Sequence, residues 1–303
     1  MAKLYHYTSG SSLHGIIGNS ELWATDLRFL NDYQELDHGL TLFEKHYKEI
    51  SKGLLEKLSN AHDFCYLMEQ IVLNIRHNAR SLPIHVISFS TKKDNLRQWM
   101  AYCQTEVGYC IEFESEELFD DEIKNCDNIQ LRNVKYEDEC SFDKQDKFPN
   151  TSFKLQDDLQ RLMFKNKISS ENNDEVNKFA NHMHKFIIQS MFSVSSVKSL
   201  EFNDESEVRV IHIGSKPEGI SDPVLDKLSS IYKPLNLQNP KYRLVSDIIV
   251  PYQIIPFNLK SIKSVIIGPT KNSFLAEFGL KMFRDINKLT FEIKHSKCTL
   301  RRF

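Results

Sequence analysis

The sequence predicts an α+β fold. Three observations support this class: short apolar stretches with strand-like alternation occur near both ends of the chain, longer stretches with helical spacing separate them, and no internal repeat is visible. With 303 residues the chain can bury a substantial core. We expect one domain spanning residues 1–303, in which strands from both ends share a sheet and the polar segment 141–195 is a helical insertion or lid.

The N-terminal part of the chain is expected to alternate between strand and helix. The expected elements are a strand at 4–8, a helix at 9–19, a strand at 21–26 and a helix at 31–50 whose pattern continues to residue 80. In the first helix the serines offer an N-cap, and Leu13, Ile16 and Ile17 form one apolar face. Asn31 or Asp32 is the expected cap of the second helix.

The rest of the chain returns to strands and then to a mixed C-terminal unit. Strands are expected at 83–91, 108–114, 129–137 and 206–213, helices at 94–104, 155–168 and 175–192, and a loop at 226–244. Asp94 is the expected cap of the helix at 94–104. The chain is expected to end in a strand at 263–269, a helix at 272–288 and a strand at 289–300.

Composition and cysteine usage limit the class of protein. The 39 Lys and Arg residues nearly balance 41 Asp and Glu, so no global field recruits nucleic acid or an anionic membrane. The sequence shows no signal-peptide core and no run of about 18 apolar residues that could span a membrane. The six cysteines are scattered without a Cys-x-x-Cys pair, which argues against structural zinc. We expect a cytoplasmic protein with reduced thiols.

Glu205 and Glu207 precede the apolar body of the strand expected at 206–213. Residues two apart in a strand point to the same face, so both carboxylates are expected to project together. Two like charges on one face reduce stability unless solvent, a cation or a substrate offsets them. The pair is therefore either a solvated strand end or part of a binding site.

His6 and two serines are further candidate site residues. His6 lies in the first expected strand, and a Ser/Gly-rich turn and a helix N-terminus follow, which is a geometry suited to an anion or a ribose hydroxyl. Ser88 and Ser90 share one face of a later strand, where hydroxyls can bond a ligand or brace a carboxylate. The alternatives are a satisfied, partly buried histidine and ordinary serines at a strand edge.

A metal site is the alternative reading of the segment "FLNDYQELDHG". Asp32, Glu35 and His38 lie within about two helical turns, a spacing that could bind a metal ion. The simpler interpretation is that Asn31 and Asp32 cap the helix and that Glu35 faces solvent or pairs with a cation. We expect no metal site in the protein.

Four blocks of the sequence occur in the order found in the bacterial family DUF2971. They are "LYHYTS…LHGIIGNSELWATDLRFLNDYQE", "SFSTKKDNLRQWMAYCQTEVGYCIEF", "ESEVRVI" and "SVIIGP". The chain resembles this family over most of its length, and the helical segment near 141–195 is the least typical part. The family has no settled function, so the resemblance by itself implies no activity.

The same blocks show a more distant resemblance to the ADP-ribosyltransferase fold. "YHYTSGSSLHGII" is similar to the strand–helix start of RNA 2′-phosphotransferases and of DNA-modifying ADP-ribosylating toxins. "ESEV" is similar to the E-x-E strand head of other members, and "SFST" is similar to their S-T-S strand. This resemblance implies a mixed-sheet core with helices packed around it, and NAD as a co-substrate. The combination of a first-strand histidine with E-x-E departs from either standard triad.

The resemblance also implies roles for individual residues. Glu207 would face the positive charge that develops when the nicotinamide–ribose bond breaks, and Glu205 would orient or deprotonate the acceptor. His6 would bond a ribose hydroxyl of the adenosine half of NAD. The remaining expected binding residues are Thr8 and Ser9 near the phosphates, Ser88 and Ser90 beside the nicotinamide or Glu207, Tyr7, Tyr33 or Phe89 stacked on a ring, and Asn31.

Three functions follow as alternatives. The first is an NAD-dependent ADP-ribosyltransferase, such as a toxin or an anti-phage defence effector, that modifies a protein or a nucleic acid. The second is a non-catalytic nucleotide or nucleic-acid binding module on the same fold, in which the glutamates are dispensable. The third is a metal-dependent hydrolase or nuclease that uses Asp32, Glu35 and a histidine.

Overall fold

The structure is a computed structural model of the whole chain. It describes residues 2–32, 34–55, 69, 72–73, 75–76, 79, 83–103, 106–136, 173–214 and 240–299, without the side chains of 50–55, 173–181, 183 and 184. The helix expected at 155–168 and the candidate residue Tyr33 lie outside the described residues.

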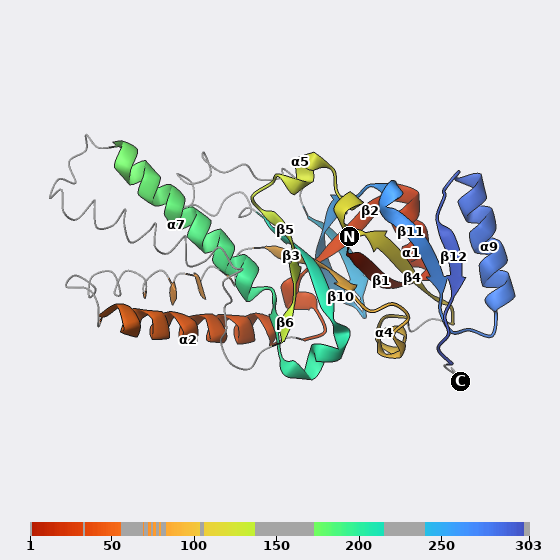
Figure 1. Ribbon diagram of the computed structural model, residues 1–303, viewed down its shortest axis with the longest axis horizontal. Coiled ribbons are helices and arrows are strands. Elements are labelled where there is room, and N and C mark those ends of the chain that lie inside the picture. The colour runs from red at the N-terminus through yellow and green to blue at the C-terminus, as the bar shows by residue number, and fades with distance from the viewer. Residues whose placement is uncertain are drawn as a thin grey trace.

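A mixed sheet of ten strands forms the body of the described chain (Figure 1). The strands are β1 (Lys3–Ser9), β2 (Glu21–Asp26), β3 (Ile84–Ser90), β4 (Gly108–Glu114), β5 (Ile129–Asn133), β8 (Glu207–Ile213), β9 (Lys241–Val245), β10 (Ile248–Pro256), β11 (Ile262–Ile267) and β12 (Glu292–His295). The main order is β12-β11-β4-β1-β3-β2-β10-β9, and β8 joins β3 to β5 outside this path. Strands from both ends of the chain therefore share one sheet, as predicted.

The sheet opens beside β3. On one edge β3 pairs with β8 along its whole length, from Ile84 to Ser90. On the other edge β1 pairs with β3 at Ser90 and β2 pairs with it at Val86 and His85. Between these two contacts the described chain places no strand against β3, so the sheet splits there.

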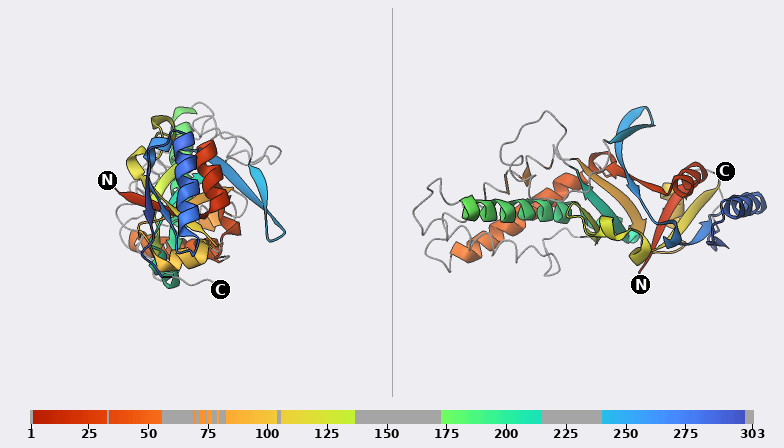
Figure 2. Two further views of the ribbon diagram at one scale, coloured as in Figure 1. Left: turned by 90° about the vertical axis from the view of Figure 1, so that its right-hand side faces the viewer. Right: turned by 90° about the horizontal axis from the view of Figure 1, so that it is seen from above.

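Helices pack on the sheet and extend beyond it. The helices are α1 (Gly10–Asn19), α2 (Glu35–Leu55), α4 (Leu96–Tyr102), α5 (Asp121–Lys124), α7 (Asn173–Val194) and α9 (Ser273–Ile286). Short 3₁₀ turns are η1 (Leu27–Phe29), η2 (Ser115–Glu117), η3 (Leu200–Glu205) and η4 (Leu259–Ser261), and β6 (Lys135–Tyr136) pairs in parallel with β7 (Val197–Lys198). Figures 1 and 2 show α2 and α7 projecting from one end of the sheet and α9 at the other.

The core of the described chain consists of separate apolar clusters. One cluster packs α1 on the sheet and includes Leu13, Ile16 and Ile17, the apolar face predicted for this helix. A second cluster joins α2, α7 and strands β3 and β8, with Phe43 and Phe186 fully buried. None of the helices in the described ranges is long and apolar enough to cross a membrane. The class is thus α+β, as predicted.

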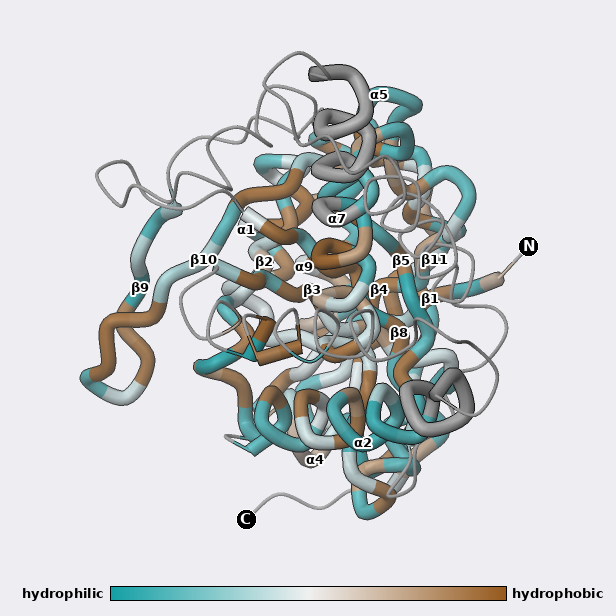
Figure 3. Tube along the Cα trace, turned by 90° about the vertical axis from the view of Figure 1, so that its left-hand side faces the viewer, coloured by the Kyte–Doolittle hydropathy of each residue, from teal (hydrophilic) through white to brown (hydrophobic). Residues whose placement is uncertain are grey.

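The hairpin of β9 and β10 projects from the sheet (Figure 2). Its two turn residues, Ser246 and Asp247, both have positive φ (47° and 66°), the backbone of the tight turn that matches strand twist. Figure 3 colours the ends of both strands next to this turn as hydrophobic, and the side chains of Leu244 and Ile249 are exposed there. Residues 241–244 were expected to belong to the loop around Pro234 and Pro240, and pairing with β10 makes them part of strand β9 instead.

Other boundaries differ from the prediction for local reasons. Helix α4 is capped by Asn95, whose side chain accepts from the Arg97 amide at 2.9 Å, while Asp94 accepts instead from the Trp99 indole. The expected strand 129–137 breaks at Val134, where the chain leaves β8 and turns to β7.

Helix α2 starts at Glu35, later than the expected cap residues. The side chain of Asp32 accepts from the Gln34 amide at 3.0 Å and forms a turn before the helix. The segment 173–194 is helical as predicted, since α7 covers it.

Candidate functional site

A cavity of about 530 Å³ lies at the split in the sheet. Residues from β1, α1, β2, β3 and β9 line it, together with the start of β8 and the end of η3. The sequence-predicted site residues that line it are His6, Tyr7, Thr8, Asn31, Ser88, Phe89, Ser90, Glu205 and Glu207. The fold therefore brings most of the candidate residues around one cavity, although they come from distant parts of the chain.

The backbone geometry that brings Glu205 and Glu207 together differs from the prediction. Glu205 ends η3, Ser206 has a left-handed backbone with φ 45°, and Glu207 begins β8. The two glutamates are therefore not alternating residues of one strand, and that expectation was wrong. Their carboxylates still meet at Lys198, whose Nζ lies 2.6 Å from Glu205 Oε2 and 3.5 Å from Glu207 Oε2. Solvent, a cation or a substrate was expected to offset the repulsion between these two carboxylates, and in the structure a cation, Lys198, contacts both.

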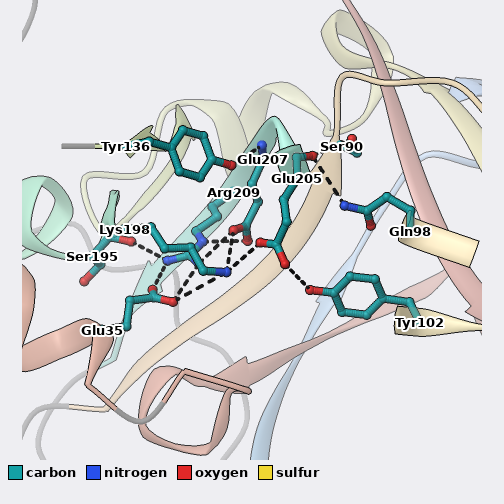
Figure 4. A network of polar contacts seen from close by, with 10 residues as sticks. All are labelled: Glu35, Ser90, Gln98, Tyr102, Tyr136, Ser195, Lys198, Glu205, Glu207 and Arg209. Carbon is teal, nitrogen blue, oxygen red and sulfur yellow. Dashed lines mark hydrogen bonds and ion pairs between the residues drawn. The ribbon is translucent and has the colours of Figure 1, made fainter. Parts of the chain in front are cut away.

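Arg209 forms the centre of a buried ion network (Figure 4). Its guanidinium, fully buried, donates to both oxygens of Glu207, with Nε at 2.7 Å and Nη2 at 2.9 Å. On its other side it donates to both carboxylate oxygens of Glu35, and Nη1 also donates to the Ser195 carbonyl. Residues from α2, β7, η3 and β8 are held together in this way, because an unpaired charge at this depth would be costly.

The charges of this network do not cancel. Three carboxylates (Glu35, Glu205 and Glu207) face two cations (Lys198 and Arg209), which leaves one net negative charge when all are ionised. Burial pushes the pKa of Glu207 upward, but Arg209 outweighs it and the pKa is lowered, so Glu207 is ionised. Burial raises the pKa of Glu35 in spite of Arg209.

Glu205 is the most accessible carboxylate of the network. Its side chain is 16% exposed, against 6% for Glu207 and 1% for Glu35. The Tyr102 hydroxyl donates to Glu205 Oε1 at 3.2 Å, and the Ser90 hydroxyl donates to its backbone carbonyl at 2.7 Å. Helix α4 and strand β3 thus fix the end of η3 at the cavity wall (Figure 4).

His6 faces the split from β1. Its Nδ1 lies 3.0 Å from the Ser88 carbonyl, which can only accept, so Nδ1 carries the proton in this contact. Burial lowers the pKa of the imidazole more than this hydrogen bond raises it, so the ring is neutral near pH 7. Nε2 is then a hydrogen-bond acceptor, which suits a ligand hydroxyl.

Two of the predicted stacking residues are packed inside the protein. The Tyr7 ring lies edge-on to Trp99 with centroids 4.8 Å apart, and its hydroxyl bonds the backbone of Lys92 and Asn95. The Phe89 ring packs edge-on against Phe113 at 5.7 Å in the core. Both residues line the cavity, but the packing of their rings argues against the stacking role expected from the sequence.

The residues near the start of α1 divide into a cap and a lining. Ser9 does not line the cavity, because its hydroxyl caps α1 by accepting from the Ser12 amide at 3.2 Å. Thr8 lines the cavity beside Ser11 and Ser12, which sequence reasoning missed. Asn31 lies exposed at the rim and does not cap α2.

The proposed metal ligands do not form a ligand group. Within the described ranges no three His, Cys, Asp or Glu side chains are placed to hold a metal ion. Glu35 lies buried against Arg209, away from a position shared with Asp32 and His38. The hydrolase alternative thereby loses the residue set on which it depended.

Lys198 and Arg209 are the site residues that the sequence reasoning missed. Arg209 could have been predicted from the sequence, because it follows Glu207 by two residues in the same strand and therefore lies on the same face. Lys198 gave no such signal, because it lies in a two-residue strand that follows α7 and reaches the carboxylates only through the fold.

Comparison with known proteins places part of the chain in a family. Residues 98–210 match the family model DUF2971, described as a protein of unknown function. The matched stretch runs from α4 through most of β8 and contains Glu205, Glu207 and Arg209, whereas His6 lies outside it. No curated protein and no solved structure matches the chain. Over residues 98–210 the chain therefore matches the family to which the four sequence blocks were likened.

Proposed function

We propose that the protein is an NAD-consuming ADP-ribosyltransferase that transfers ADP-ribose to a protein or nucleic-acid acceptor. One observation carries the proposal: a single cavity is lined by a first-strand histidine, the serines of β3 and the carboxylates at the start of β8. This is the set of positions that the resemblance to the ADP-ribosyltransferase fold assigns to NAD. As a toxin or defence effector, such an enzyme would act on a macromolecule of the cell in which it is produced.

The acidic end of the cavity suits the chemistry of nicotinamide release. Breaking the nicotinamide–ribose bond gives an oxocarbenium-like transition state, which an anionic site stabilises relative to the ground state. Glu207 is ionised and fixed in position by Arg209, so its orientation costs no reorganisation during the reaction. The Ser88 hydroxyl helps to lower the pKa of Glu207, and His6 lines the same cavity, where we assign its unprotonated Nε2 to accept from a ribose hydroxyl.

Glu205 is assigned to the acceptor. It is the outermost carboxylate of the network, where an incoming macromolecule would reach it first. Lys198 and Tyr102 both donate to it and hold it at the cavity wall. A carboxylate held in this way can orient or deprotonate an acceptor nucleophile, a contribution of typically 10²–10⁴-fold in rate.

The test uses labelled NAD and one matched control. Purified protein is incubated with NAD labelled in the adenylate half, with and without cell lysate, and nicotinamide release and label transfer are measured. Glu205→Gln should lower transfer by about 10²-fold or more because it removes the acceptor base. Glu201→Gln, the same change at an exposed position of η3, should leave transfer unchanged. Absence of nicotinamide release by wild-type protein under all these conditions would overturn the proposal.

A second function is favoured by the ion pairs themselves. All three carboxylates of the network already contact a cation, as they would in a purely structural network. A non-catalytic nucleotide-binding module would therefore use the same cavity without turnover. It predicts that NAD binds to wild type and to Glu205→Gln with equal affinity and that nicotinamide is never released.

A further inference from the structure

Arg243 is a cation without an acidic partner in the cavity wall. It extends from β9 towards β2, where Nη2 donates to the Thr25 hydroxyl at 2.8 Å. Within the described ranges no carboxylate forms an ion pair with it, and its Nε is buried without a hydrogen-bond partner. Burial lowers the pKa of Arg243, and no carboxylate among the described residues offsets this effect. A partly buried charge of this kind is destabilising until an anion binds to it.

An aromatic surface lies next to Arg243. Trp23 stacks on Tyr252 with ring centroids 4.4 Å apart and an interplanar angle of 27°. The guanidinium carbon of Arg243 is 5.8 Å from the Trp23 ring and 5.7 Å from the Tyr252 ring. A group equally far from two stacked rings lies beside the stack, so it does not cover the outer face of Trp23. Trp23 is 41% exposed and lines the cavity.

The two ends of the cavity differ in charge. Thr25 pairs with Val86 on β3, and Glu207 pairs with Ser90, four residues further along the same strand. At about 3.3 Å per residue this separates the two ends by about 13 Å. The carboxylates suit the cationic nicotinamide riboside, whereas Arg243 suits a phosphate. Only a ligand longer than a nucleoside can contact both ends.

We infer that Arg243 and Trp23 form a subsite for the adenylate half of a dinucleotide, with a phosphate on Arg243 and the base on the outer face of Trp23. The inference rests on the proposed function and assigns the direction in which NAD lies in the cavity. Arginine pairs with phosphate through parallel N–H bonds, and an exposed tryptophan face stacks on a base. The subsite recognises ADP by itself, without the nicotinamide riboside.

The experiment measures binding of NAD and of ADP by calorimetry. Arg243→Gln should weaken both ligands by at least about tenfold, since an arginine–phosphate pair contributes more than one ordinary hydrogen bond. Lys241→Gln, an exposed basic residue of the same strand, is the matched control and should bind both ligands like wild type. If Arg243→Gln fails to fold, Arg243→Lys retains the charge but cannot form the parallel N–H bonds, so it should still weaken binding of both ligands by at least about threefold.

A spectroscopic readout separates binding from a structural role of the two residues. ADP should quench tryptophan fluorescence in wild type, and Trp23→Phe should remove this quenching while it leaves ADP affinity within about threefold, because phenylalanine also stacks. The chain has two tryptophans, and Trp99 is fully buried, so it should not respond.

The outcomes distinguish the subsite from the reaction. ADP binding that depends on Arg243 without any nicotinamide release would support the subsite and overturn the transferase. Nicotinamide release together with equal ADP affinity of wild type and Arg243→Gln would overturn the subsite and leave the transferase intact. A wild-type protein that binds neither ADP nor NAD would overturn both.

Discussion

At the residue scale, Arg209 decides how three elements meet at the cavity. It is fully buried, and its five contacts to Glu207, Glu35 and the Ser195 carbonyl join β8, α2 and the turn after α7. Replacing both partners of such a network by apolar groups can be neutral, but removing one partner leaves a buried charge uncompensated. The same guanidinium fixes the carboxylate that we assign to transition-state stabilisation.

Arg209→Met should therefore lower the free energy of unfolding by about 3–5 kcal/mol, because Glu207 and Glu35 lose their shared cation. Chemical denaturation of the purified variant measures the change. Arg97→Met is the control, since Arg97 and its partner Asp204 have side chains 60% and 68% exposed and such a pair contributes at most about 1 kcal/mol. Equal losses in the two variants would show that the network does not stabilise the fold.

At the element scale, the packing of α2 against α7 depends on Gly39. A Cβ at this position would lie 2.3 Å from the carbonyl oxygen of Val194, the last residue of α7, which is far below contact distance. The close approach of these helices brings Glu35, four residues earlier on α2, to Arg209. The sequence predicts both helices from their periodicity, but nothing in either segment predicts their contact.

Gly39→Ala should destabilise the protein by about 1–3 kcal/mol, because the backbone at Val194 must move to accommodate the methyl group. Gly279→Ala is the matched control: it lies in α9 with open space around its Cβ, and should stabilise the protein by about 0.5–1 kcal/mol through helix propensity. Thermal unfolding of both variants gives the comparison, and a shift of the same sign in both would contradict it.

At the scale of the whole molecule, two histidines couple stability to pH. His85 and His212 are buried opposite each other on β3 and β8, and among the described residues neither nitrogen of His85 has a hydrogen-bond partner. Burial lowers the pKa of His212 from 6.5 to about 3 and also lowers that of His85. Between pH 6.5 and about 3 the unfolded chain protonates His212, whereas the folded protein keeps it neutral. The contribution of this histidine to stability is therefore fully present above pH 6.5 and decreases as the pH falls below that value.

His212→Gln should therefore reduce the dependence of the free energy of unfolding on pH between pH 6.5 and 5 by up to about 1.4 kcal/mol per pH unit. This range lies above the ordinary pKa of Glu112, 4.5, where the carboxylate is ionised in both the folded and the unfolded chain, so Glu112 contributes little to the slope. His14→Gln, at an exposed position of α1, is the control and should leave the slope unchanged. A slope equal to that of wild type in His212→Gln would refute the prediction.

The sequence by itself determined the elements whose signals are local. The apolar face of α1, the presence of strands β3 and β4 and the strand–helix–strand unit at the C-terminus depend on neighbours in the chain, and the structure confirms them. The alternation expected of a half-buried strand at 108–114 is absent, because β4 is buried on both faces. The family followed from blocks of residues in a fixed order. Where a competing local partner existed, as with Asp94 and Asn95, the choice of helix cap was wrong.

The tertiary structure alone decided what surrounds the candidate residues. Glu205 and Glu207 meet through a left-handed turn and not through strand alternation, and their cation, Lys198, comes from a different strand. Arg243 reaches the cavity because a hairpin pairs with β2 more than 200 positions away in the chain. Contacts of this kind carry no periodic signal, since loop closure over long distances depends on the packing of the whole chain and not on its local pattern.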